Sequence, residues 1–101
     1  MTQIKELVKH IRCELDDAEE YAVAGARYME EDRQLGEMYM QLAREEIQHA
    51  HKEHEQAVRL VREYENRGKA VPEAMRAVWD WEHEMMIEHE AKIQNILQAA
   101  K

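Results

Sequence analysis

Cysteine is nearly absent from this chain of 101 residues, since Cys13 is the only one. A single cysteine excludes an intrachain disulfide and any C-x-x-C metal or redox motif. Such usage favours a reducing compartment, and the first residues are charged throughout rather than apolar like a secretory signal. We therefore expect a cytoplasmic protein.

Long apolar runs and an excess of basic residues are also missing. No apolar stretch approaches the ~18 residues that a membrane span needs. With 14 Lys and Arg against 22 Asp and Glu, the net charge of −8 has the wrong sign for neutralising phosphates. We therefore expect neither a membrane nor a nucleic acid among the partners.

Glycine and proline are scarce, with three and one copies. Together with 45% hydrophobic and 36% charged residues, this scarcity is typical of helix-rich proteins rather than sheets or disordered chains. The length fits one domain over residues 1–101, but a domain this small buries only about two-thirds of its unfolded surface. We therefore expect a partner chain in a homodimer or a larger homo-oligomer.

The few signals that start or end helices divide the chain into three parts. Asp32 suits a helix start, Gly68 a helix end, and Pro72 a first helical turn. We predict helices at about residues 3 to 30, 33 to 67 and 72 to 100. Short connections predict that successive helices run antiparallel, so the expected fold class is all-α, an antiparallel three-helix bundle completed by oligomerisation.

Each predicted helix carries an apolar stripe at spacings of three and four residues. The stripes contain Ile4, Leu7, Val8, Ile11, Leu15, Ala18, Tyr21, Ala22, Gly25 and Met29; then Leu35, Met38, Tyr39, Leu42, Ala43, Ala50, Ala57, Leu60, Val61 and Tyr64; then Val71, Met75, Val78, Met85, Met86, Ile93, Ile96 and Ala100. The second helix has a further, narrower apolar face with Met40, Ile47 and Val58, which favours packing against another chain.

Six ionisable residues interrupt these stripes: Glu14, Glu46, His49, Glu53, Glu82 and His89. Glu46 and His49 form an E-x-x-H motif, whose side chains leave one helix face at roughly 5 Å separation and can ligate the same or adjacent metal ions. In antiparallel neighbouring helices, the connecting turn decides which residues lie opposite one another. On this basis all six residues fall within about two helical turns of one another along the bundle. One shared site is the economical explanation.

Metal is the expected counterion of this cluster. Unpaired buried carboxylates are costly and four together repel one another, while neither Lys nor Arg occupies the central stripe positions nearby. Carboxylates and imidazoles without a thiolate suit iron or manganese, and zinc also fits. Six ligands match two ions.

The stretch from Glu14 to Tyr21, followed 32 residues after Glu14 by the E-x-x-H at Glu46 and His49 and then Ala50, resembles the ferritin-like di-iron carboxylate superfamily. The rubrerythrin and bacterioferritin branches are the nearest, and the resemblance covers residues 4 to 60. Those families normally use four helices and a second E-x-x-H, whereas this chain offers three helices and Glu82 with His89. Short encapsulated ferritins, whose di-iron site forms where two chains meet, suggest that another subunit supplies what is missing.

The resemblance implies that the chain binds two iron ions and oxidises ferrous iron with oxygen or peroxide, as a ferroxidase or peroxidase-like oxidoreductase. Glu14 and Glu82 would be terminal ligands, Glu46 or Glu53 would bridge, and His49 and His89 would each bind one ion. Tyr21 would hydrogen-bond a ligand or take part in radical chemistry as a catalytic residue. No rubredoxin module is recognisable, so a peroxidase cycle would need a separate electron donor.

Two other hypotheses stay open. In the first, the chain is a non-catalytic helical interaction or assembly module whose polar seam sets oligomer register. In the second, it holds a purely structural metal with saturated coordination.

Overall fold

The computed structural model describes residues 2–69 and 71–100, apart from the side chain at position 74. Over these residues it contains three helices and no strand: α1 at Thr2–Tyr28, α2 at Arg33–Asn66 and α3 at Glu73–Ala99. The predictions of an all-α fold and of three helices are confirmed, and each helix boundary lies within two residues of its predicted place. No helix in this part of the chain combines the length and apolar character that crossing a membrane requires.

The helix ends follow the sequence signals. The Asp32 side chain accepts a hydrogen bond from the backbone N–H of Leu35 at 3.2 Å, which satisfies one of the free donors of the first turn of α2. Beyond Arg67, Gly68 has φ +74°, a left-handed conformation that glycine adopts without a steric cost. Pro72 directly precedes α3, where its missing N–H costs no helical hydrogen bond.

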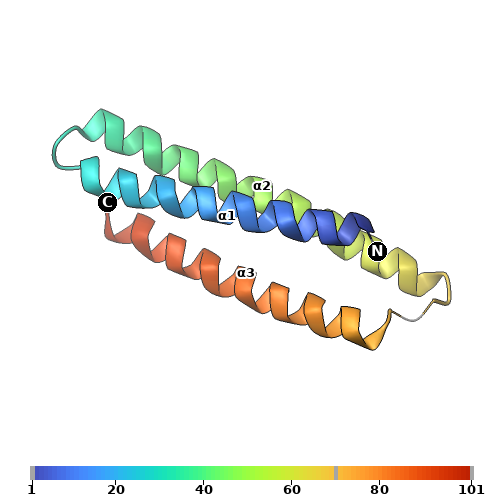
Figure 1. Cartoon of the computed structure of the whole chain (residues 1–101). Helices are drawn as coiled ribbons and strands as arrows, with labels where there is room; N and C mark the ends of the chain where they lie inside the picture. The colour runs from blue at the N-terminus through green and yellow to red at the C-terminus, as the bar shows by residue number, and fades with distance from the viewer. Residues whose placement is uncertain (1, 70, 101) are drawn as a thin grey trace.

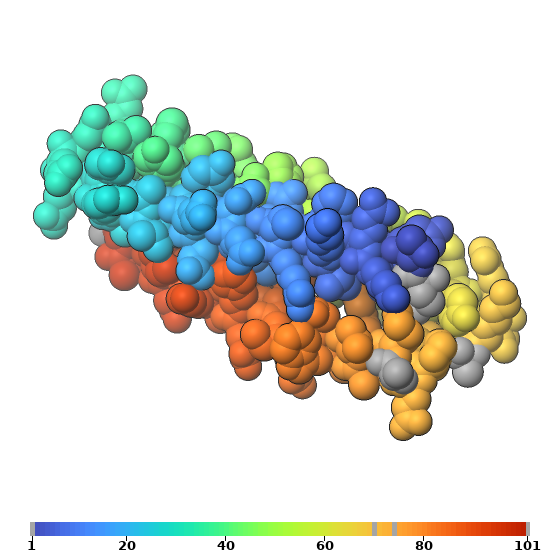
Figure 2. Space-filling model, viewed as in Figure 1, coloured from blue at the N-terminus to red at the C-terminus, as the bar shows by residue number. Residues whose placement is uncertain are grey.

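The three helices lie side by side in a rod of about 56 × 17 × 16 Å (Figure 1). Figure 1 shows α2 running back along α1, and α3 returning in the direction of α1. Two contacts between α1 and α3, Arg12 with Glu82 and Glu19 with His89, join residues that are each 70 positions apart, as expected for helices that run in the same direction. The surfaces of α1 and α3 adjoin along the middle of the molecule (Figure 2).

Small side chains fill the contact between α1 and α2. Ala18, Ala22, Ala43 and Ala50 are completely buried there, which lets the two backbones approach closely. At the connecting turn the approach needs glycine, because a Cβ added at Gly36 would lie 2.9 Å from the backbone of Met29, the first residue after α1. The larger core residues are Ile11, Leu15, Met40, Ile47, Ile93 and Leu97.

The apolar stripe predicted for α2 is partly confirmed, since its members Ala43, Ala50, Ala57 and Val61 are buried, but the inner face is centred further round the helix. Met40 and Ile47, expected on a face for another chain, are buried in the core of this one. The stripe members Leu35, Tyr39 and Leu42 are only half-buried. A helix with two apolar faces does not reveal which one packs within the chain, and here the face nearest the small residues of α1 does so.

The apolar stripe predicted for α3 is only partly buried. Ile93 is fully buried, as is Leu97, which the predicted stripe omitted. By contrast Val78 is 55% exposed and Met85 44%, because this half of α3 contacts its neighbours through polar and aromatic side chains.

Candidate metal centre

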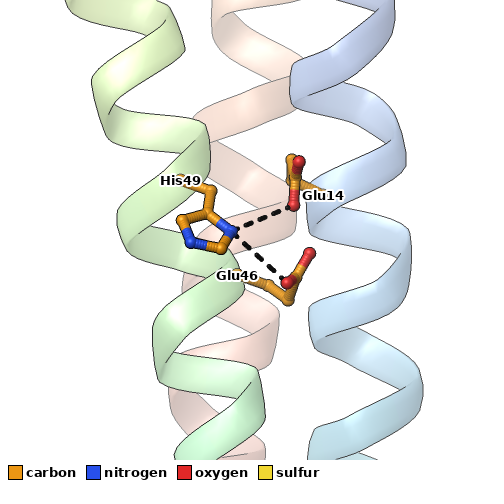
Figure 3. A group of neighbouring side chains, drawn as sticks. All are labelled: Glu14, Glu46 and His49. Atoms are coloured by element: carbon orange, nitrogen blue, oxygen red, sulfur yellow. Dashed lines mark ion pairs between the residues drawn. The ribbon is translucent and has the colours of Figure 1, made fainter.

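The E-x-x-H motif lies midway along α2, where it faces Glu14 of α1. Each of Glu14, Glu46 and His49 offers a ligand atom, and these atoms lie within 4.8 Å of one another. His49 Nδ1 is 3.4 Å from Glu46 Oε1 and 3.5 Å from Glu14 Oε2 (Figure 3). Thus the sequence-based grouping of these three residues matches their arrangement in the structure.

The group opens to solvent on one side. Figure 3 shows the three side chains between α1 and α2, with α3 passing behind them. The Glu46 and Glu14 side chains are 19% and 27% exposed, whereas His49 is 52% exposed. The carboxylates therefore form the base of the group, and the imidazole forms its rim.

The two carboxylates perturb each other. A hydrogen bond with Glu14, burial and the negative charge of Glu14 raise the pKa of Glu46 to about 7, against a smaller opposing effect of His49. Near neutral pH, the pair thus relieves its repulsion by holding a proton between the two carboxyl groups. A divalent cation would serve the same purpose, and its binding would displace that proton.

Glu53 lies seven residues beyond Glu46, on the same side of α2 but outside the three-residue group. Its Oε1 is buried without a hydrogen-bond partner, and burial together with the charge of Glu14 raises the pKa of Glu53. A buried, unpaired carboxyl oxygen next to a carboxylate pair is chemically suited to receive a cation. Glu53 remains a candidate ligand, although it lies outside the three-residue group.

Glu82 and His89 of α3 contact other residues. Glu82 forms an ion pair with Arg12, whose Nε lies 2.8 Å from Glu82 Oε2, and His89 Nε2 lies 2.8 Å from Glu19 Oε1. The expectation that protein cations are absent near the six residues therefore fails at Glu82. Two positions advance a helix by about 200°, so Arg12 and Glu14 point to nearly opposite sides of α1, and α3 contacts a different side of α1 from the three-residue group.

Tyr21 is not part of the three-residue group but belongs to a row of stacked tyrosines. Its ring stacks on Tyr39 with the centroids 6.3 Å apart, and Tyr39 stacks on Tyr28 at 6.0 Å. The sequence analysis placed Tyr39 only in an apolar stripe and did not consider Tyr28.

A second group of side chains, none of them among the six predicted ligands, lies between α2 and α3. The rings of His54, His83 and Trp79 stack on one another, with the two imidazole centroids 4.9 Å apart. His54 Nε2 is buried without a hydrogen-bond partner. Burial lowers the pKa of His54, and the charge of the nearby His83 lowers it further. His54 follows Ile47 by seven residues and so shares its side of α2, but the sequence analysis had assigned Ile47 to a face for another chain.

Comparison of the chain with family models, with curated proteins and with solved structures finds no match. The assignment of a metal centre therefore depends on the donor atoms themselves. Two carboxylates and one imidazole, with no thiolate in the group, fit iron or manganese and also accept zinc. Three protein ligands around one ion leave further coordination positions open to a second chain, water or a substrate.

Proposed function

We propose that this protein is a ferritin-like di-metal carboxylate protein that binds ferrous iron and oxidises it with oxygen or peroxide, at a site shared by two copies of the chain. The observation that carries the proposal is the convergence of Glu14, Glu46 and His49 within 4.8 Å on an open face of α1 and α2. Three ligands are half of the six that a di-iron carboxylate site uses, and a symmetric pair of chains supplies six.

The surroundings of the group support pairing of two chains. Half-buried apolar side chains flank it along α1 and α2, on the side away from α3, and we call them the open strip: Leu7, Tyr21, Tyr28, Leu35, Tyr39, Leu42, Leu60 and Tyr64. In a two-fold contact each chain uses the same patch, so residues at the centre of the patch meet their own copies. With the strip as interface, the two groups face each other in a bundle of four helices from α1 and α2.

This arrangement assigns the ligands differently from the sequence analysis. Four carboxylates and two imidazoles come from Glu14, Glu46 and His49 of both chains, and Glu82 and His89 instead join α3 to α1. Four facing carboxylates need positive charge, which two divalent ions supply. Glu53, with its unpaired buried oxygen, extends the ligand set toward one end of the strip.

The residues of the chain bind and orient the ferrous substrate. The imidazole of His49 binds through a lone pair, the carboxylates neutralise the ions, and the proton held with Glu46 leaves as iron arrives. In two-metal sites the ions lie about 3.5 to 4 Å apart, close enough to act on one oxidant together. Each ferrous ion gives up one electron to oxygen or peroxide.

The test adds Fe(II) anaerobically to chelator-stripped protein, measures bound iron, and then admits oxygen. We expect about one iron per chain and protein-dependent oxygen uptake in the wild type, with both lost in a Glu46→Ala, His49→Ala double variant that keeps its helicity. Glu55→Ala, on the exposed side of α2, is the matched control and should leave iron binding unchanged. A Glu82→Gln, His89→Gln variant should also keep the iron.

The alternatives predict different outcomes. Iron binding no stronger than in the double variant, with stability unaffected by chelation, would favour an interaction module with a polar seam. Stoichiometric binding without oxidation would favour a structural metal.

A further inference from the structure

An exposed apolar row lies on the N-terminal half of α3, the orange half that adjoins the blue half of α1 in Figure 2. It consists of Val78, Trp81 and Met85, whose spacing of three and four residues places them within about 60° of one another around the helix. Ile87 is also exposed but points at least about 120° away from all three, so it is not part of the row. Apolar side chains gathered in this way, rather than scattered singly, mark a contact surface for another molecule.

The row borders two adjoining hollows between the helices. The first has a volume of about 270 Å³, and apolar side chains from all three helices and the α2–α3 connection line it: Ile4, Val8, Val61, Val71, Met75, Val78 and Trp79. The second is smaller, at about 50 Å³, and Met85 lines it. Val8 and Trp79 line both, so the hollows follow one another between α1 and α3. Since a cavity of about 150 Å³ holds one benzene ring, the first hollow has room for one or two large apolar side chains.

Basic side chains form the α1 edge of the same surface. Lys5, Lys9 and Arg12 lie within about 60° of one another around α1, and Lys5 also lines the first hollow. Arg12 pairs with Glu82, and its guanidinium lies 5.8 Å from the centre of the Trp81 ring. Lys5 and Lys9 form no ion pair with any residue that the structure describes. In a chain with a net charge of −8, these two lysines give the apolar row a positive border.

Acidic residues end this surface at one height along the rod. Asp16 follows Arg12 by one turn on α1, and Glu88 follows Met85 by about one turn on α3. Because residue 12 of α1 lies beside residue 82 of α3 and the two helices run in the same direction, these two acids are at nearly the same height. The apolar row, the two hollows and the basic edge therefore share about three helical turns, and we call them together the α1–α3 groove.

We propose that the α1–α3 groove binds an acidic amphipathic helix of another protein. The partner helix lies along the groove for about three turns and inserts apolar side chains, spaced three or four residues apart on one face, into the two hollows. Asp or Glu side chains on its flank pair with Lys5 and Lys9. Trp81 is the expected centre of the contact, because exposed tryptophans contribute disproportionately to the energy of protein interfaces.

A helix fits these features better than an anionic membrane surface does. A layer of lipid headgroups meets protruding side chains, whereas much of the apolar lining here is recessed between helices. The carboxylates of Asp16, Glu84 and Glu88 next to the groove would also be repelled by an anionic membrane. The groove lies on the other side of α1 from Glu14, so binding here is independent of the metal centre.

The experiment selects helical peptides from a phage-displayed library on the immobilised protein. The library fixes leucine along one face of a helix of about four turns and varies the flanking positions among Glu, Lys, Gln and Ser. We expect the enriched peptides to carry Glu along one flank. A fluorescent peptide of this kind should bind at least about tenfold more tightly than its counterpart with Lys in place of each Glu, as measured by fluorescence anisotropy.

Variants of the protein assign the binding to the groove. Trp81→Ser should weaken binding of the acidic peptide by at least about tenfold, whereas Ile87→Ser, at a similarly exposed position on another side of α3, should leave it unchanged. Lys5→Glu combined with Lys9→Glu should reverse the preference, so that the lysine peptide binds more tightly than the acidic one. Such a reversal requires a folded protein, which separates loss of charge complementarity from loss of structure.

Other results would overturn the proposal. No enrichment of peptides over that on the Trp81→Ser protein would exclude a helical partner, and equal binding of the acidic and lysine peptides would exclude recognition of charge. Co-sedimentation with phosphatidylglycerol vesicles that is lost in Trp81→Ser, without peptide enrichment, would assign the groove to an anionic membrane. Self-association of the iron-free protein that is lost in Trp81→Ser, again without enrichment, would assign the groove to a second copy of the chain.

Discussion

At the scale of single residues, the pair formed by Glu14 and Glu46 dominates the chemistry of the open strip. Two acidic side chains from neighbouring helices meet in a partly buried place, and Glu46 responds with a pKa of about 7. In the absence of metal, the native fold therefore prefers Glu46 protonated, whereas the unfolded chain prefers it ionised above its ordinary pKa of 4.5.

This difference predicts a pH-dependent stability of the metal-free protein. Because the folded pKa lies above the unfolded one, the stabilising effect of the proton is complete below about pH 4.5 and is lost as the pH rises through about 7. Glu46→Gln mimics the protonated form and should lose less stability than the wild type between about pH 5 and pH 8. Urea unfolding at several pH values measures the difference.

Glu55→Gln is the control for this comparison, since Glu55 is exposed on α2 and should leave the pH slope unchanged. Equal slopes for the wild type and Glu46→Gln would show that the carboxyl pair does not retain its proton in the folded protein.

The sequence predicted part of the six-residue cluster, and the structure brings together only Glu14, Glu46 and His49. The E-x-x-H spacing and the position of Glu14 were enough to bring three residues together. Glu82 and His89 lie at about the predicted height along the rod. Height along the rod, however, does not determine to which side of the helix a side chain points. Arg12, two residues before Glu14, points to the other side of α1 and there meets Glu82.

At the scale of helices, the contact between α1 and α2 is closest near their turn. A Cβ at Gly36 would lie 2.9 Å from both the N and the Cα of Met29, whereas at Gly25 the nearest atom, at 2.7 Å, is Cγ of the flexible Met40 side chain. The backbone of Met29 moves only if the turn and the end of α1 shift, but a methionine side chain changes its rotamer at less cost.

We therefore expect Gly36→Ala to destabilise the protein more than Gly25→Ala. Overpacking typically costs about 1–3 kcal/mol, and the better helix propensity of alanine offsets up to about 1 kcal/mol of it. Gly36→Ala should thus lower the free energy of unfolding by about 1–2 kcal/mol, with a smaller loss for Gly25→Ala. Chemical denaturation of both variants checks the order, and the reverse order would mean that the helices separate easily at Gly36.

The positions of the helix ends were predictable because capping and turn residues act on the backbone next to them in the sequence. The choice of the inner face of α2 was not, because that helix carries one apolar face with Met40 and Ile47 and another with Tyr39 and Leu42. Either face satisfies helical periodicity, and only the small residues contributed by α1 decide between them.

At the scale of the whole molecule, the rod has two unequal long sides. The open strip carries Glu14, Glu46 and His49 together with half-buried apolar side chains, whereas α3 exposes Val78, Trp81 and Ile87 on more than one of its sides. The shared metal site that we propose requires the first of these sides to meet its own copy.

We predict that Leu42→Glu weakens dimer formation and iron binding together, because it places a charge in the strip one turn from Glu46. Ile87→Glu, at a side chain that is 54% exposed on α3, is the control and should affect neither property. Sedimentation velocity with and without Fe(II) measures the association. Dissociation by Ile87→Glu with no effect of Leu42→Glu would place the contact between copies on α3.

The alanines buried between α1 and α2 have a consequence for metal selectivity. Ala18, Ala43 and Ala50 fix how far apart the two helix axes lie, and this separation in turn fixes the span between Glu14 and Glu46. In the proposed metal site, the ionic radius that the carboxylates accommodate would thus be set by methyl groups that never touch an ion. In such a protein, preference for one cation over another can evolve through the hydrophobic core while every ligand stays the same.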